Sequence, residues 1–84
     1  MGEIVAAIDC GTNSTRMLIG ESTRSTEVFR TLDRRMMVTR MGEGVDSRRR
    51  FADPAVERVL GVLAGYRQVM EALGVERCRM VATS

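Results

Sequence analysis

The sequence predicts a small α/β domain whose elements follow the order β-β-β-α-β. Short apolar or alternating runs, separated by turn residues, fill its first half and are typical of strands. An Asp-Pro pair then opens a long stretch with apolar side chains at helical spacing, and one more short apolar run follows it. The chain is 84 residues long, which suffices for one small domain at most.

The composition is that of a globular protein with a weak charge. Apolar residues make up 44% of the chain, which is enough for a core, and 13 arginines against 11 acidic residues give a net charge of +2. So small a charge gives no argument for a nucleic-acid or membrane partner. No apolar run is long enough to cross a membrane, and the N-terminus lacks a signal-peptide pattern. Because lysine and histidine are both absent, a histidine base and a P-loop lysine are excluded.

The two cysteines, Cys10 and Cys78, do not have the spacing of a metal site. Each lies within an apolar, strand-like run. We therefore expect both thiols to be buried and reduced, in keeping with a cytoplasmic protein.

A tight turn joins the first two predicted strands. Ile4–Ile8 is a continuous apolar run, which predicts a strand buried on both faces. Gly11–Ser14 has turn chemistry, and Thr15–Glu21 returns as the second strand. In that second strand one face carries Met17 and Ile19, and the other carries Arg16 and Leu18.

The third strand is predicted to be interrupted by charges. A turn at Ser22–Ser25 leads into a strand at Thr26–Leu32, which Asp33–Arg35 interrupts before the extended pattern resumes at Met36–Met41. The segment Gly42–Gly44 then breaks the chain.

Asp53 and Pro54 predict the start of a helix, as an N-cap acid followed by proline at the first helical position. Gly74 is placed to end it. The helix is expected to pack through an apolar stripe that consists of Val56, Val59, Leu60, Leu63, Tyr66, Met70 and Leu73. Cys78–Thr83 predicts a last, buried strand, which needs neighbours and a cover, so we expect the sequence to be the first part of a larger domain.

The first turn is also a candidate phosphate loop. Asp9 ends the first strand, where its carboxylate can hold a hard cation directly or through water. Gly11 permits close approach of a ligand and tolerates positive φ, and Thr12, Asn13 and Ser14 offer donors that can converge on one anion. Arg16 can pair with a phosphate oxygen from the second strand. A plain hairpin remains the alternative, because turns prefer these residue types in any case.

At these residues the sequence resembles the actin and sugar-kinase superfamily. "IDCGTNSTRMLI" is similar to its first phosphate-binding motif, and most similar to the motif of the exopolyphosphatase / guanosine pentaphosphate phosphohydrolase (Ppx/GppA) family. The family's Asp-x-Gly-[Ser/Thr]-Asn-Ser core is matched by Asp9, Gly11, Thr12, Asn13 and Ser14. "VTRMGEGVD" and "ALGVERCRMVATS" resemble two later family stretches, so the resemblance covers nearly the whole chain.

This resemblance implies a ribonuclease-H-like (actin-like ATPase) half-domain, incomplete, in which residues 1–84 form part of the first of two lobes. It implies Mg²⁺-dependent attack of water on a terminal phosphoryl group of inorganic polyphosphate or of guanosine pentaphosphate (pppGpp), and the sequence does not separate these substrates. Asp9 matches the metal position, Gly11–Ser14 match the phosphate loop, and Arg16 matches a phosphate-contacting arginine of some members. The resemblance also implies a homodimer of the full-length protein.

Two departures from the family pattern shape the expected activity. Arg48–Arg50 stand in a loop that usually carries few charges; a solvated charge run is expected, with an anion-attracting surface as the alternative. The family's catalytic glutamate and second glycine-rich loop belong after Ser84. We therefore expect no general base and no turnover from this chain, since Glu21, Glu27 and Glu43 are candidate bases by residue type alone.

Two other functions stay open at this point. One is a segment of a carbohydrate- or acetate-kinase-like enzyme that uses ATP and shares the first motif. The other is a non-catalytic fragment that binds phosphate weakly or not at all.

Overall fold

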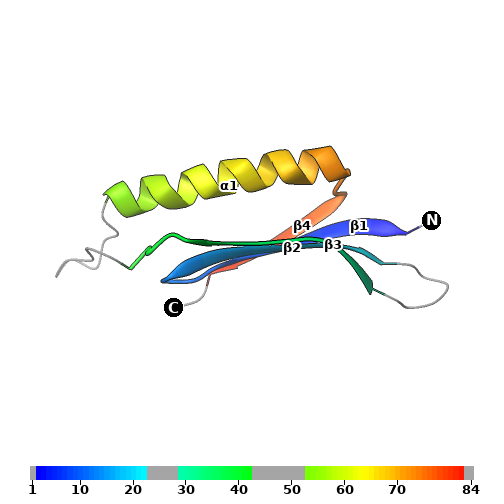
Figure 1. Cartoon of the computed structure of the whole chain (residues 1–84), viewed down its shortest axis with the longest axis horizontal. Helices are drawn as coiled ribbons and strands as arrows, with labels where there is room; N and C mark the ends of the chain where they lie inside the picture. Colours follow the sequence, from blue (N-terminus) through cyan, green and yellow to red (C-terminus); the bar gives the residue numbers. More distant parts are fainter. Residues whose placement is uncertain (1, 23–28, 43–52, 83–84) are drawn as a thin grey trace.

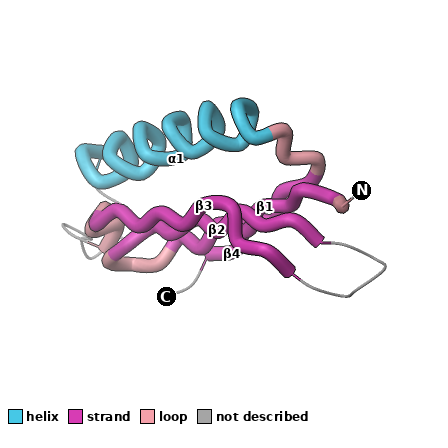
Figure 2. The backbone as a smooth tube through the Cα atoms, turned by 45° about the vertical axis from the view of Figure 1, so that its right-hand side comes forward, coloured by secondary structure: helices cyan, strands magenta, loops and turns pink. Residues whose placement is uncertain are grey.

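The order β-β-β-α-β predicted from the sequence is confirmed. The computed structural model describes residues 2–22, 29–42 and 53–82. Its elements are β1 (Glu3–Cys10), β2 (Ser14–Ser22), β3 (Phe29–Val38), α1 (Asp53–Leu73) and β4 (Arg77–Ala82). Figures 1 and 2 show α1 lying along one face of the sheet, while no described element covers the other face, called the open face below.

The four strands form one mixed sheet in the order β3-β2-β1-β4. β1 pairs antiparallel with β2, β2 pairs antiparallel with β3, and β4 adds parallel to β1 on the other side. The turn between β1 and β2, the end of β3 and the start of α1 therefore lie at the same end of the molecule (Figure 1). Within the described ranges, no helix combines the length and apolar character needed to cross a membrane.

The two central strands separate an apolar face from an open one. In β1, buried Ala6, Ile8 and Cys10 alternate with exposed Ala7 and Asp9, so the prediction of a strand buried on both faces was wrong. Only the side under α1 is covered among the described residues. The alternation predicted for β2 is confirmed, because its side chains facing the helix are buried; these are Met17 and Ile19.

The interruption predicted in the third strand was wrong, because β3 runs without a break from Phe29 to Val38. Asp33 faces Ile19 and Thr31 faces Gly20, so one extra residue is absorbed as a bulge instead of a break. The charges fit because β3 is an edge strand with exposed side chains, where Arg35 and Asp33 pair at 2.8 Å. The predicted start at residues 26–28 and most of the turn before it lie outside the described residues.

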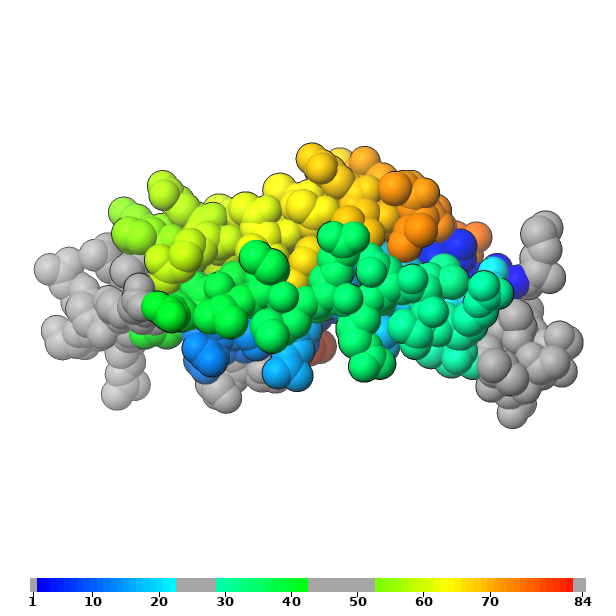
Figure 3. Space-filling view, viewed as in Figure 1, coloured from blue at the N-terminus to red at the C-terminus, as the bar shows by residue number. Residues whose placement is uncertain are grey.

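α1 packs through a narrower stripe than the sequence predicts. Val59 and Tyr66 are buried, whereas Leu60 is 59% exposed and Leu73 is 37% exposed. Figure 3 shows the helix surface resting against edge strand β3, and a groove lined by both elements runs between them. The predicted end is confirmed: Gly74 has a φ of 73°, and the Val75 amide donates to the Met70 carbonyl at 3.0 Å, as in a Schellman cap.

β4 does not have the buried environment that its apolar residues predict. It spans Arg77–Ala82, pairs only with β1 among the described strands, and all six residues are exposed. The prediction of a buried Cys78 was therefore wrong, whereas the prediction for Cys10 is confirmed, since Cys10 is 6% exposed in the core. Edge position, and not hydropathy, sets the exposure of this strand.

The core under α1 predicts an asymmetric response to truncation of apolar side chains. Ile19→Ala should lower the free energy of unfolding by about 2–5 kcal/mol, because Ile19 is fully buried and its loss leaves a cavity. Leu60→Ala is the matched control and should change stability by less than about 0.5 kcal/mol, since that side chain lies mostly in water. Urea unfolding followed by circular dichroism measures both values. Equal losses would contradict the assignment of the core to the helix side of β2.

Candidate phosphate-binding site

The turn between β1 and β2 is closed by its own backbone. The Gly11 amide donates to the Ser14 carbonyl at 2.9 Å, so this amide is used inside the hairpin. Gly11 does not use the positive φ that the sequence allowed for; among the described glycines only Gly74 has one. The turn is thus closed as a hairpin without a left-handed residue at Gly11.

The carbonyls at the tip of the turn are bonded to the segment that follows β3. Thr12 and Asn13 are exposed, and Ser14 is half-buried. The Asn13 carbonyl accepts from the Thr39 and Arg40 amides, both at 3.0 Å. The Thr12 carbonyl accepts from the Gly42 amide at 3.0 Å. Within the described ranges neither the Thr12 nor the Asn13 amide donates to a protein acceptor, so both remain available to an anion.

Asp9 and Arg16 meet on the open face beside this turn. They are directly opposite one another in the register of β1 and β2, and both are exposed. They line a hollow of about 480 Å³ together with Arg34 of β3 and Arg79 of β4. In the adjacent row of the sheet Leu18 pairs with Arg34 and Ala7 pairs with Arg79, which sets those arginines on the same face. The lining of the hollow is therefore basic, and Asp9 is its one carboxylate.

The donors present fit a magnesium ion only in combination with a phosphate. No group of three or more acidic, cysteine or histidine side chains capable of holding a metal occurs among the described residues. Mg²⁺ is commonly held by one or two carboxylates, with waters and substrate phosphates completing its octahedron. The exposed carboxylate of Asp9 can supply one such ligand next to the turn.

A buried polar pair that the sequence analysis missed lies behind the turn. The hydroxyls of Thr15 and Thr39 are 2.9 Å apart, and both residues are almost completely buried. The Tyr66 hydroxyl of α1 donates to the Thr15 carbonyl at 2.7 Å. The signal was present, since Thr15 falls on the apolar face of β2, where a hydroxyl needs a partner.

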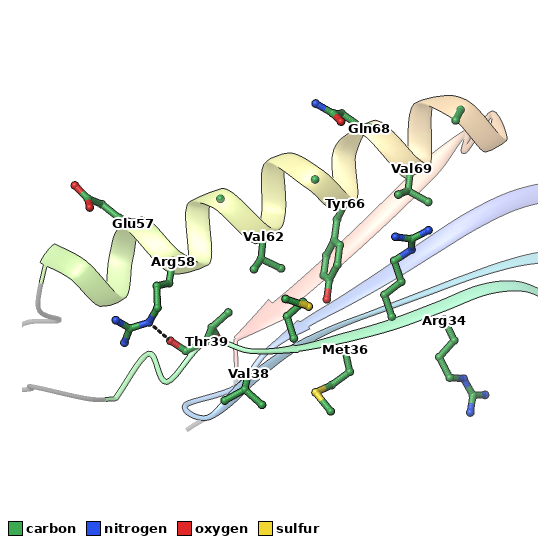
Figure 4. Close-up of a pocket in the computed structure, with 15 residues that line it drawn as sticks. Arg34, Met36, Val38, Thr39, Glu57, Arg58, Val62, Tyr66, Gln68 and Val69 are labelled. Atoms are coloured by element: carbon green, nitrogen blue, oxygen red, sulfur yellow. Dashed lines mark hydrogen bonds between the residues drawn. The ribbon is translucent and has the colours of Figure 1, made fainter.

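Arg58 of α1 also contacts this region and was not singled out from the sequence. Its Nε donates to the Thr39 carbonyl at 2.8 Å (Figure 4), and its Nη2 donates to the Arg40 carbonyl at 3.2 Å. Arg40 itself has a φ of 50°, the left-handed conformation that is uncommon outside glycine. The sequence did offer one signal: Arg58 directly precedes Val59 of the apolar stripe, so its side chain lies close to the buried side of the helix.

Glu21 is the one remaining candidate that the structure describes, and it does not join the site. Glu21 lies near the far end of β2, roughly 23 Å from Ser14 at about 3.3 Å per residue of strand. Glu27, Glu43 and Arg48–Arg50 fall outside the described residues.

Comparison with curated proteins finds relatives that are much longer than this chain. Exopolyphosphatase 2 of Mycobacterium tuberculosis is 42% identical over 82 residues, which are 95% of this chain and 26% of that protein. The bifunctional 3-dehydroquinate synthase/phosphatase of Fusobacterium nucleatum is 29% identical over 79 residues, which are 90% of this chain and 12% of that protein. No family model matches the sequence.

Solved structures give the same picture. A Ppx/GppA protein of Aquifex aeolicus superimposes with a TM-score of 0.89 at 27% identity, over 98% of this chain and 26% of that one. An exopolyphosphatase-like protein superimposes with a TM-score of 0.87 at 36% identity, over 99% of this chain and 25% of that one. The resemblance to the Ppx/GppA family and the expected actin-like fold are thus confirmed, and the chain spans about a quarter of its relatives' length.

The Thr15–Thr39 pair predicts that removal of one hydroxyl lowers the free energy of unfolding much more than removal of both. Thr39→Val should lower the free energy of unfolding by about 1–3 kcal/mol, because the buried Thr15 hydroxyl is left without its partner. The double variant Thr15→Val/Thr39→Val should recover most of that loss, since two apolar isosteres leave no unpaired group. Urea unfolding of the four proteins of this cycle measures the coupling, and additive losses would exclude a direct bond.

Burial of two acidic groups predicts a loss of stability at alkaline pH. Burial raises the pKa of Tyr66 above its ordinary 10.0, with Arg35 lowering it and Cys10 raising it. Burial, and then the nearby Asp9 charge, raise the pKa of Cys10 above 9.0. The unfolded chain therefore loses these protons first, so the contribution to stability is complete below about pH 9 and falls as pH rises through the folded values.

Urea midpoints measured under reducing conditions from about pH 8 to pH 11 should decline, with a shallower decline in Tyr66→Phe because one of the two groups is gone. A pH-independent midpoint over this range would contradict the burial of both groups.

Proposed function

We propose that this chain is the N-terminal phosphate-binding segment of a hydrolase that releases terminal phosphate from inorganic polyphosphate or guanosine pentaphosphate. The observation that carries the proposal is the turn after β1. Its Thr12 and Asn13 amides have no protein acceptor within the described ranges, and Asp9 and Arg16 stand opposite each other beside it. It is supported by the likeness of the chain to one quarter of an exopolyphosphatase. Polyphosphate is the substrate we favour, because that relative is an exopolyphosphatase.

Each group of the turn has a distinct proposed role. The Thr12 and Asn13 amides, with the hydroxyls of Thr12 and Ser14, bind and orient phosphate oxygens. Arg16 pairs with the phosphate chain through its planar fork of donors. Asp9 holds Mg²⁺, which when bound neutralises charge on the phosphates.

The described residues account for binding but not for turnover. Phosphoryl transfer needs an oriented water and charge stabilisation from several sides at once. Asp9 is the only carboxylate that lines the hollow on the open face, and the proposal already uses it for the metal. We therefore assign the general base to the part of the family's length that this chain does not span. We also place the protein in the cytoplasm, where both of its thiols stay reduced.

Titration of the chain with tripolyphosphate, with and without Mg²⁺, tests the site. Arg16→Gln should weaken binding about tenfold, the effect of losing one charge-assisted pair worth about 1.5 kcal/mol. Asp9→Asn should remove the additional affinity that Mg²⁺ provides and leave the metal-free binding largely intact. Calorimetry at constant ionic strength measures the affinity of the parent chain, of these two variants and of a control variant, Arg67→Gln.

Arg67→Gln is that control, because it removes the same charge from an exposed residue paired with Glu71 on α1. It should change the affinity less than about twofold, since exposed charges are screened within about 10 Å. Equal weakening by Arg16→Gln and Arg67→Gln would show non-specific attraction and refute the site. Phosphate release from polyphosphate by the chain itself, abolished in Asp9→Asn, would overturn the assignment of the base elsewhere.

A further inference from the structure

We infer that Arg58 of α1 is a positioning residue for the phosphate loop, which it orders through hydrogen bonds to the backbone of residues 39–40. The inference rests on the proposed function of the turn at Thr12 and Asn13. Arg58 thereby links α1 to the turn between β1 and β2 through the segment that follows β3.

The first layer of this arrangement is a guanidinium that bridges two successive carbonyls. Arg58 donates from Nε to the Thr39 carbonyl at 2.8 Å (Figure 4) and from Nη2 to the Arg40 carbonyl at 3.2 Å. A planar guanidinium can hold two acceptors in fixed relative orientation, which a single ammonium group cannot do. Packing of this part of the helix does not require the charge, because neighbouring Ala55 and Val59 are the buried residues.

The second layer leads from the same backbone to the turn. The Thr39 carbonyl and the Arg40 amide belong to one peptide unit, which accepts from Arg58 on one side and donates to the Asn13 carbonyl on the other. Hydrogen bonds linked through one polar group strengthen each other. The Thr39 and Gly42 amides add bonds to Asn13 and Thr12. Ordering of this segment is thus passed to Thr12 and Asn13, whose amides the proposed function uses.

The backbone at Arg40 gives an independent reason for such a clamp. Its φ of 50° lies in the left-handed region, where a side chain with a Cβ is strained and persists only if its surroundings hold it. Arg58 binds the carbonyl on each side of this Cα, since Thr39 precedes it and Arg40 supplies the other. Without the guanidinium, residues 39–40 can leave this conformation, and the hydrogen bonds that they donate to the Asn13 carbonyl weaken.

The test compares Arg58→Gln and Arg58→Lys with the parent chain and with Arg67→Gln. Native-state hydrogen exchange is measured at the Thr39, Arg40 and Gly42 amides, and tripolyphosphate affinity is measured well below the unfolding transition. Arg58→Gln should speed exchange at these amides and weaken binding about tenfold, because only a fraction of loop conformers remains competent. Arg58→Lys keeps the charge and the alkyl stem but holds one carbonyl at a time, so it should fall between Arg58→Gln and the parent.

Each outcome decides the matter. Unchanged exchange and affinity in Arg58→Gln would overturn the inference, as would a lower unfolding midpoint with unchanged affinity of the folded protein, which indicates a structural role only. Full affinity in Arg58→Lys despite fast exchange would assign the effect to charge and also overturn it. If the parent chain binds no tripolyphosphate, the proposed function fails, whereas exchange at the three amides still decides whether Arg58 orders the segment. Should Arg58→Gln not fold, the same comparison is made with Arg58→Lys.

Discussion

The hydrogen bonds that the Asn13 carbonyl accepts from the Thr39 and Arg40 amides are the contact on which the site depends. They tie a hairpin turn to the end of β3, residues far apart in the sequence that the β2–β3 register brings together. The carbonyls of the turn are used in these bonds, whereas the Thr12 and Asn13 amides have no protein acceptor within the described ranges. This is the arrangement on which the proposed anion-binding role of the turn rests.

The sheet divides structural and chemical roles between its two faces. On the helix side Ile8, Met17 and Ile19 form a core with Tyr66, and the only buried polar residues described there are the hydrogen-bonded Thr15 and Thr39. On the open face Asp9 and Arg16 stand beside the turn without disturbing that core. The alternation of side chains along a strand makes this separation possible, since adjacent residues serve opposite faces.

The helix contributes to the site as well as to the core. Tyr66 and Arg58 both reach from α1 to backbone near the turn. Tyr66 contacts Thr15 in β2, and Arg58 contacts Thr39 just after β3. Docking of the helix and ordering of the turn are thus linked through polar contacts near buried groups. In the longer relatives, about three quarters of the length lies outside the part that this chain matches.

The sequence by itself determined the order of elements, the alternation in β2, the two ends of α1 and the turn that carries the candidate loop. These features follow from local signals, such as Asp53-Pro54 and Gly74, that act over a few residues. Tertiary structure alone decided that Asp33 stays within a strand, that Cys78 is exposed and that β1 is covered on one face. It also brought Arg58, Thr39 and Asn13 together, because strand order, edge position and register depend on pairing between distant segments, which local periodicity does not encode.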